Sequence, residues 1–183
     1  MGTQKPDREV RFRALYVDAY GDVLRFARRR VHPCYAEDVA ADAFLVAWRR
    51  LDEAPNRPDD LRAWLFGIAR HCLLNSLRGQ GRANALAVRV AEGVPPAGPV
   101  GGLDADLVAA RVDLAAAWRR LSETDQEALS LTVFEDLTSA QAGRVLGITA
   151  VSYRLRLLRA RRALRRQLDL AESSSYAQIE TQS

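Results

Sequence analysis

LTSAQAGRVLGITAVSYRLRLLRARRALRRQL, residues 137–168, is the stretch that decides the fold of the second half of this chain. It predicts a short helix, a tight turn around Gly147, and a long second helix that carries seven arginines. Like charges three and four residues apart repel each other on a helix, and a phosphate backbone is the commonest partner that offsets this repulsion. A helix, a glycine-containing turn and a basic helix form the layout of a helix-turn-helix, whose second helix enters the major groove of DNA.

The second helix of this motif has a buried side and a side that faces DNA. Thr149 is a good N-cap for it. A helical wheel at about 100° per residue places four residues on one buried face: Tyr153, Leu157, Ala160 and Leu164. Arginine to guanine is the commonest specific contact in the major groove. The predicted contacts to base edges and phosphates, near the start of the helix, are Ser152, Arg154, Arg156 and Arg159. Four more arginines lie further along the helix and are predicted to touch the DNA backbone: Arg161, Arg162, Arg165 and Arg166.

The same wheel turns Val151, Leu155 and Leu158 outward, opposite the buried face. Leucine packs on thymine methyl groups in the major groove, so Leu155 and Leu158 could read thymines. Alternatively, a regulator protein covers this strip when DNA is absent, because exposed apolar patches mark binding sites. We hypothesise the first explanation, and Leu155 and Leu158 therefore join the candidate DNA contacts.

The composition excludes several classes of protein. The chain has 183 residues, 48% hydrophobic and 27% charged, with a formal net charge of +4, which is typical of a globular protein of one or two domains. The N-terminus lacks the apolar run of a signal peptide, and no stretch approaches the roughly 18 apolar residues of a membrane span. We therefore expect a cytoplasmic protein with no membrane insertion of its own. Because neither a nucleophile motif nor a glycine-rich phosphate loop is present, we expect no enzyme and no cofactor.

Two cysteines, Cys34 and Cys72, are too few for a disulfide framework, and a reducing cytosol is their simplest setting. His32 and His71 lie close to them in sequence. Neither spacing is that of a structural zinc pair, and the adjacent His71 and Cys72 point in different directions on a helix. We therefore expect no metal site.

Proline and glycine divide the chain into two all-α domains. Apolar residues recur at helical spacing almost throughout, and the first domain is predicted to have helices over about 12–27, 36–51 and 61–77. Pro33 marks the first boundary, and Asp59 or Asp60 is a candidate N-cap for the third helix. Residues 91–102, AEGVPPAGPVGG, exclude a regular helix and indicate a linker. The predicted organisation is a helical domain over 8–82, a flexible Pro/Gly linker over 83–106, a helix-turn-helix domain over 107–170, and a polar, disordered tail over 171–183.

Three segments, in order, resemble a sigma factor of the extracytoplasmic-function (ECF) type, the smallest class of the sigma-70 family. They are AEDVAADAFLVAWRRLD (36–52), LRAWLFGIARHCLLNSLRGQGR (61–82) and LSETDQEALSLTVFEDLTSAQAGRVLGITAVSYRLRLLRARRAL (121–164). Their spacing and the intervening linker also match, and the resemblance covers about residues 10–170. It implies an alternative sigma factor that binds the RNA polymerase core, reads the minus-35 and minus-10 elements of specific promoters, and aids their melting.

The first segment resembles the helix that docks on a coiled coil of the polymerase core. An acidic surface beside aromatic side chains suits a basic partner helix. The chain departs from the family at Ala41, where a glutamine is usual, and this puts one polymerase contact in doubt. The predicted docking residues are Glu37, Asp38, Asp42, Phe44 and Trp48.

The second segment resembles the part that melts and reads the minus-10 element. Binding of single-stranded DNA needs a positive groove and side chains that receive extruded bases. His71 and Asn75 occupy positions that face unstacked bases in the family. At the position of His71, asparagine is commoner in the family. Gly67 stands where the family often has a basic residue. The predicted minus-10 contacts are Arg70, His71, Asn75, Arg78 and Arg82.

The third segment resembles the minus-35 reader. The resemblance therefore assigns minus-35 contacts to Ser152, Arg154, Leu155, Arg156, Leu158 and Arg159. It also makes polymerase an alternative partner for the arginines further along the helix, from Arg161 to Arg166. RNA polymerase core and promoter DNA are the implied partners, and an anti-sigma factor is a further candidate because the family often uses one. The main alternative is a stand-alone helix-turn-helix regulator, which predicts a dimer, a palindromic operator and a ligand pocket. A helical adaptor is the third possibility, but it predicts no salt-dependent DNA binding, contrary to the arginine clusters.

Overall fold

The computed structural model describes residues 4–79 and 105–181, with side-chain surroundings described for 7–79 and 107–170. Every regular element in these ranges is helical, which confirms the predicted all-α class. Residues 83–104 of the predicted linker, and with them Arg82, lie outside the described residues. The elements in chain order are α1 (Gln4–Arg28), α2 (Pro33–Arg49), the 3-10 helix η1 (Leu51–Glu53), α3 (Pro58–Gly79), α4 (Ala105–Arg119), α5 (Glu123–Val133), α6 (Ser139–Leu146) and α7 (Ala150–Thr181).

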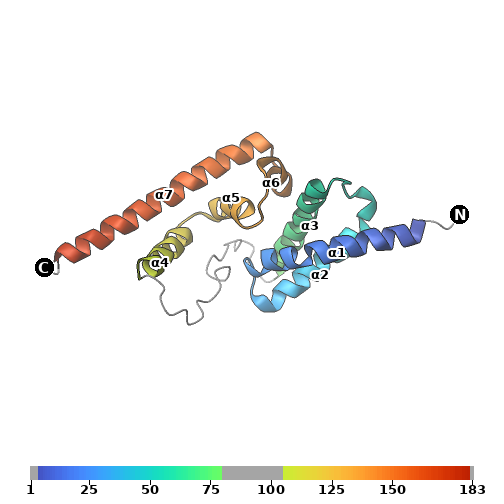
Figure 1. Ribbon diagram of the computed structural model, residues 1–183, viewed down its shortest axis with the longest axis horizontal. Coiled ribbons are helices and arrows are strands. Elements are labelled where there is room, and N and C mark those ends of the chain that lie inside the picture. The colour runs from blue at the N-terminus through green and yellow to red at the C-terminus, as the bar shows by residue number, and fades with distance from the viewer. Residues whose placement is uncertain (1–3, 80–104, 182–183) are drawn as a thin grey trace.

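The first half is a bundle in which α2 packs against both α1 and α3 (Figure 1). Pro33 occupies the first turn of α2, and the His32 imidazole accepts a hydrogen bond from the Cys34 amide, so the boundary predicted at Pro33 is confirmed. α3 begins at Pro58, so Asp59 and Asp60 lie in its first turn instead of capping it. Carboxylates in that turn still stabilise α3, because the N-terminal end of a helix dipole is positive.

Aromatic side chains join α1 to α2 in the first half. The ring of Phe12 lies 5.0 Å from Trp48, and Tyr16 lies 4.8 Å from Phe44, both in edge-to-face geometry. Such pairs add about 0.5–1.5 kcal/mol each beyond the burial of their area. The contact fixes α2 against α1, and this positions the outer face of α2.

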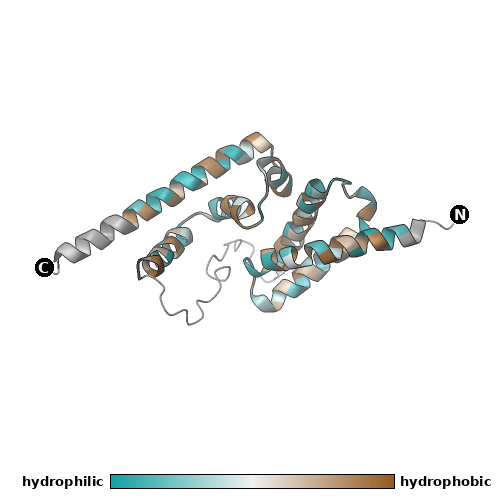
Figure 2. Ribbon diagram, in the orientation of Figure 1, coloured by the Kyte–Doolittle hydropathy of each residue, from teal (hydrophilic) through white to brown (hydrophobic). Residues whose placement is uncertain are grey.

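The second half is arranged around α7, which packs against α4, α5 and α6 (Figure 1). Ser122 caps α5, since its hydroxyl accepts a hydrogen bond from the Asp125 amide at 3.1 Å. Tyr153 of α7 is fully buried, and its hydroxyl donates to the Ala128 carbonyl at 2.7 Å. Much of α7 is otherwise hydrophilic, as Figure 2 shows.

Helix α7 continues to Thr181, so the backbone is helical where a disordered tail was predicted from Ala171. The composition of the tail, which is polar and serine-rich, suggested disorder. However, neither proline nor glycine follows Gly147 in the sequence. This stretch therefore contains no residue of the kind that ends a helix abruptly.

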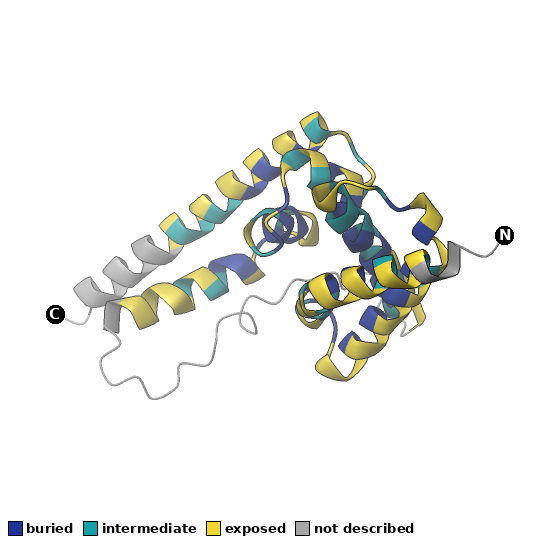
Figure 3. Ribbon diagram, turned by 45° about the vertical axis from the view of Figure 1, so that its right-hand side comes forward, coloured by how far each residue is buried: buried dark blue, intermediate teal, exposed yellow. Residues whose placement is uncertain are grey.

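The two halves pack against each other, chiefly through α3 and α6. Figure 3 shows that the described buried residues lie on the inner sides of both halves and that α7 keeps an exposed outer side. The predicted two-domain organisation included no contact between the domains. The contact places the first helix of the helix-turn-helix beside the helix that carries the predicted minus-10 residues.

Candidate nucleic-acid and polymerase interfaces

Two glycines shape the turn between α6 and α7. Gly147 has φ of 68°, in the left-handed region, and its amide donates to the Arg144 carbonyl. Gly143 lies so close to the turn that a Cβ atom there would be 2.8 Å from the Ile148 carbonyl oxygen. Thr149 then caps α7, accepting from the Ser152 amide at 3.1 Å, which confirms the predicted N-cap. The turn therefore fixes the direction in which α7 leaves α6.

The predicted wheel of α7 is confirmed on both faces. Tyr153, Leu157 and Ala160 are buried, and Leu164 is half-buried. On the opposite side, the exposed fractions are 57% for Val151, 50% for Leu155 and 46% for Leu158. Because Tyr153 also bonds to Thr132 at 2.8 Å, the buried face is anchored on α5 by polar as well as apolar contacts.

The predicted minus-35 contacts lie together along the first three turns of α7. Arg156 is half-buried at the flank of the helix. The other five are exposed: Ser152, Arg154, Leu155, Leu158 and Arg159. This row combines hydrogen-bond donors for base edges and phosphates with two apolar side chains, which is the chemistry that major-groove reading needs.

The predicted minus-10 residues of α3 do not share one face. His71, Asn75 and Arg78 are exposed and fall at helical spacing on one side of the helix, together with the half-buried Trp64. Arg70 is turned about 100° from His71 around the helix axis. It therefore points toward the second half of the chain and not along the row formed by the other three.

Arg70 is already paired in this conformation. Its guanidinium donates to both carboxylate oxygens of Glu127 in α5, with Nε to Oε1 at 2.7 Å and Nη2 to Oε2 at 3.2 Å. Arg62, on the same helix, pairs with Asp22 at 2.9 Å and donates to the backbone carbonyl of Glu135. Two of the basic side chains of the predicted melting segment thus bind groups of this chain itself.

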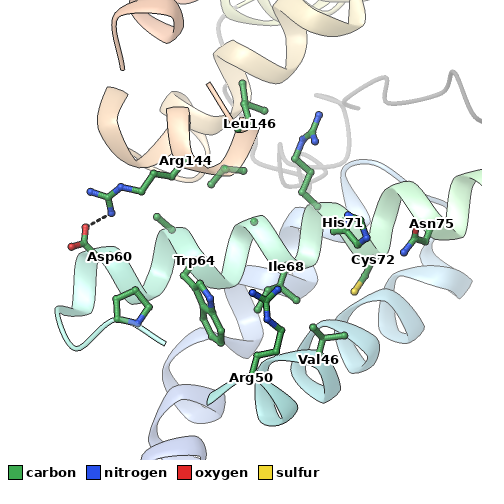
Figure 4. Close-up of a pocket in the computed structure, with 16 residues that line it drawn as sticks. Val46, Arg50, Asp60, Trp64, Ile68, His71, Cys72, Asn75, Arg144 and Leu146 are labelled. Carbon is green, nitrogen blue, oxygen red and sulfur yellow. Dashed lines mark hydrogen bonds and ion pairs between the residues drawn. The ribbon is translucent and has the colours of Figure 1, made fainter. Parts of the chain in front are cut away.

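A cleft of about 570 Å³ lies along α3, beneath α6. Figure 4 shows Arg144 and Leu146 of α6 on one side of α3, with His71 and Asn75 further along α3. The cleft therefore joins side chains of the predicted minus-10 surface to side chains of the helix-turn-helix.

The outer face of α2 is acidic, with an apolar residue in it. Glu37, Asp38 and Asp42 are exposed, as a docking surface requires. Leu45, which the sequence analysis did not single out, is 48% exposed. Its spacing of seven residues from Asp38 and three from Asp42 places it on their face of the helix, and this spacing was the available signal.

The two predicted aromatic docking residues do not lie on that face. Phe44 is only 3% exposed, so its prediction as a surface contact is wrong. Its ring is covered by Tyr16 and Tyr20 of α1, a long-range contact that the sequence of α2 does not indicate. Trp48 is half-buried, lying 5.0 Å from Phe12 and beneath the Arg8 guanidinium at 5.1 Å.

The thiols of Cys34 and Cys72 are both free. Cys34 is exposed and its sulfur lies 2.9 Å from His32 Nδ1. Burial, together with the charge of Asp42, raises the pKa of the half-buried Cys72 thiol. Among the described residues, no group of three or more histidine, cysteine or acidic side chains is placed to hold a metal ion.

Comparison with known proteins assigns both halves. Sigma-70 region 2 matches residues 15–83, and sigma-70 region 4 matches residues 111–164. Sigma factor CnrH of Cupriavidus metallidurans is 33% identical over 145 aligned residues, and the match covers 73% of each chain. ECF sigma factor SigL of Mycobacterium tuberculosis is 29% identical over 84% of this chain and 86% of its own length. The probable sigma factor RfaY of Xanthomonas campestris is 31% identical over 73% of this chain, which spans only 34% of RfaY.

Solved structures agree with this assignment. CnrH in complex with the cytosolic domain of CnrY superposes with a TM-score of 0.59 at 28% identity, covering 87% of this chain and 88% of that one. RpoE in complex with the anti-sigma factor NepR from Bartonella quintana shares the fold, with a TM-score of 0.61 at 24% identity over 86% of this chain and 96% of that one.

A two-domain helical fold with region 2 in one half and region 4 in the other defines a transcription initiation factor of the sigma class. The chain belongs to the sigma-70 family, in its extracytoplasmic-function group. In the parts of the chain that the structure describes, no helix is long and apolar enough to cross a membrane.

Proposed function

We propose that this chain binds the RNA polymerase core and directs initiation at specific promoters, reading the minus-35 element with the start of α7 and the minus-10 element with α3. The observation that carries this proposal is the exposed row on α7 from Ser152 to Arg159, held over a fully buried Tyr153. A recognition helix needs such a rigid base, since its side chains must meet base edges within hydrogen-bond distance.

The docking surface proposed for the polymerase core is the outer face of α2, around Asp38, Asp42 and Leu45. Exposed carboxylates around one apolar side chain suit a basic helix that carries an apolar residue of its own. Electrostatic complementarity of this kind raises association rates and selects the partner. Phe44 supports the surface from beneath, since it is buried against α1.

Each half offers a small footprint, and neither should bind a promoter strongly alone. When polymerase holds both, binding of one half raises the effective concentration of the other at the promoter. Specificity then depends on the spacing between the two elements as well as on base contacts. The chain itself contributes binding energy for the melted strand, and the polymerase performs the chemistry, so we propose a non-enzymatic factor acting in the cytoplasm.

An anti-sigma factor is the regulatory partner that we propose. The solved relatives CnrH and RpoE were each determined with a regulator, the cytosolic domain of CnrY and NepR. The exposed strip of Val151, Leu155 and Leu158 on α7 is a second surface, besides the groove of DNA, that such a protein could cover.

The decisive experiment adds the purified chain to core polymerase and a library of randomised promoters, and sequences the transcripts. We expect initiation downstream of paired elements at a fixed spacing, and none without the chain. A stand-alone regulator, the alternative, would instead bind palindromic sites as a dimer without polymerase and would leave initiation by the core unchanged.

A charge reversal separates docking from DNA binding in the same assay. Asp38→Lys should reduce binding to core polymerase by about tenfold, because it places like charges opposite a basic partner. Glu123→Lys, an equal reversal on the exposed start of α5, is the matched control and should bind core normally. An equal loss of binding to core polymerase in both variants would contradict the proposed docking surface. It would not affect the conclusion that the promoter experiment gives on initiation.

A further inference from the structure

Besides the packing of α6 on α3, ion pairs between residues far apart in the sequence join the two halves. The two carboxylate oxygens of Glu127 accept hydrogen bonds from Nε and Nη2 of Arg70, at 2.7 Å and 3.2 Å. Glu135 lies beside two arginines of the turn that follows α1, 3.0 Å from Arg29 and 3.6 Å from Arg30. Arginines of the first half thus meet carboxylates of the second half at two separate places.

The centre of this interface is deeply buried. Glu135 and Arg30 are each 2% exposed, and Arg30 also donates to the Ser130 hydroxyl at 2.7 Å. Burial lowers the pKa of Arg30 to about 10, and burial raises the pKa of Glu135 against the opposing effect of the two arginines. A charge is tolerated at such a place only when it is paired, so each half supplies the partner that the other needs.

The edge of the interface joins the helix-turn-helix to the start of α3. Arg144 of α6 forms an ion pair with Asp60, as Figure 4 shows. Gln141, one turn earlier, donates to the Asp59 carbonyl at 3.1 Å. The first helix of the minus-35 reader is therefore held against the helix that carries the minus-10 residues.

This closed arrangement occupies part of the minus-10 surface. A carboxylate offers a guanidinium the same pair of oxygen acceptors as a phosphate does, and both bind its fork side-on. While Glu127 accepts hydrogen bonds from Nε and Nη2 of Arg70, a promoter phosphate cannot bind the same pair of donors. His71 and Asn75, which should receive bases, line the cleft beneath α6.

We propose that the free chain holds itself closed, with the carboxylate of Glu127 standing in for a promoter phosphate on Arg70 while Glu135 pairs with Arg29 and Arg30 to stabilise the closed form. Promoter DNA then binds α3 only after α5 has left Arg70. The inference rests on the proposed function, since it concerns the regulation of the same minus-10 surface. Its structural part, the closed free chain, does not depend on any promoter.

The interface is suited to opening as well as closing. Ion pairs taken out of water gain little net free energy, because desolvation offsets most of their attraction. Arg30 Nε is buried and has no hydrogen-bond partner among the described residues, so the centre is incompletely satisfied. An interface of this polar kind is typical of domains that move relative to each other.

The test compares Glu127→Gln with the unchanged chain, and uses Glu123→Gln as the matched control. Glu127→Gln keeps the shape of the side chain and removes the charge that faces Arg70. Glu123 carries the same charge on the same helix but is exposed. Two quantities are measured on each free, full-length chain: its radius of gyration by small-angle X-ray scattering, and its affinity for a single-stranded minus-10 oligonucleotide by fluorescence anisotropy.

We expect Glu127→Gln to be more extended and to bind the oligonucleotide about tenfold more tightly, since affinity is reduced by the fraction of chains unable to bind. Glu123→Gln should match the unchanged chain, and all three should initiate equally once polymerase separates the halves. An extended unchanged chain, or an extended Glu127→Gln chain without tighter binding, would overturn the proposal. If none of the three chains initiated transcription, the proposed function would be contradicted. The radius of gyration would still show whether the free chain is closed.

Discussion

At the scale of single residues, Leu155 and Leu158 are exposed leucines within a row of basic side chains, and this position indicates what they contact. Their exposed fractions, 50% and 46%, are high for leucines on a helix that packs well on its other side. They lie between Arg154 and Arg159, which suit phosphates and guanines. An apolar group in that row gains most by contacting thymine methyl groups, so we infer that the minus-35 element contains thymines.

Leu155→Ser tests this inference. The variant should bind a minus-35 duplex about tenfold more weakly and lose its preference for thymine, because one good base contact is worth about 1–3 kcal/mol of discrimination. Binding-site selection on the unchanged and variant chains measures both effects. Leu107→Ser on α4, where the leucine is 57% exposed, is the control and should change neither. A selection without thymines, unaffected by Leu155→Ser, would favour a protein partner for the strip.

Gly67 offers a second prediction at this scale. It lies inside α3, and an added Cβ atom would meet nothing within 4 Å. Glycine in a helix interior is about 1 kcal/mol less favourable than alanine. Gly67→Ala should therefore raise the free energy of unfolding by about that amount, as measured by urea denaturation. A decrease would mean that α6 approaches α3 more closely than the free space there suggests.

At the scale of elements, the helix-turn-helix depends on a close approach of backbone to backbone. A Cβ atom on Gly143 would lie 2.8 Å from the Ile148 carbonyl oxygen and 3.3 Å from the Ala150 nitrogen, so the turn would have to move. Both contacts are with backbone, which cannot rotate away as a side chain can. The direction of α7 relative to α6 is thus set by the absence of one methyl group.

Gly143→Ala should consequently destabilise the second half by about 1–3 kcal/mol, the usual cost of forcing an extra methyl group into a packed site. Thermal unfolding of the variant measures this effect, and a minus-35 duplex should bind more weakly because α7 is displaced. Gly67→Ala is the matched control, since the same substitution meets open space there and should act in the opposite direction. Equal effects at the two positions would contradict the role assigned to the turn.

The elements also show what a sequence pattern can reveal. The helix boundary at Pro33 and the buried and exposed faces of α7 follow from local spacing, and the structure has both. The pattern did not reveal that Arg70 points away from His71 toward α5, although the difference of about 100° between neighbours on a helix was available. Phe44 shows the other kind of failure, because its burial depends on aromatic residues of α1 about thirty positions earlier, and helical spacing carries no information on distant partners.

At the scale of the whole molecule, the closed arrangement is the feature that no local pattern predicts. Arg70 and Glu127 are 57 residues apart, and Arg29 and Glu135 are 106 residues apart. Each of these side chains appears in the sequence as an ordinary surface charge. Their pairing depends on how the two domains pack against each other. The sequence shows only the charges and a predicted linker long enough to permit that packing.

The pair of Arg144 and Asp60 at the edge of the interface gives the closed form a pH dependence. The hydrogen bond from Arg144 lowers the pKa of Asp60 below its ordinary value of 3.8. A carboxyl whose pKa is lowered in one conformation stabilises that conformation while it is ionised. The contribution is therefore complete above about pH 4 and is lost as the pH falls through the lowered pKa.

Exchanging the charges of this pair tests whether the halves meet as described. Arg144→Asp alone places two carboxylates together, and Asp60→Arg alone places two guanidiniums together. Each single variant should therefore raise the ratio of extended to closed chains a few-fold. The double variant restores an ion pair with reversed polarity and should return the chain to a compact form. The radius of gyration of the four free chains, measured at neutral pH and low salt, gives the coupling between the two positions. Additive effects, with the double variant the most extended of the four, would show that Arg144 and Asp60 do not meet in the free chain.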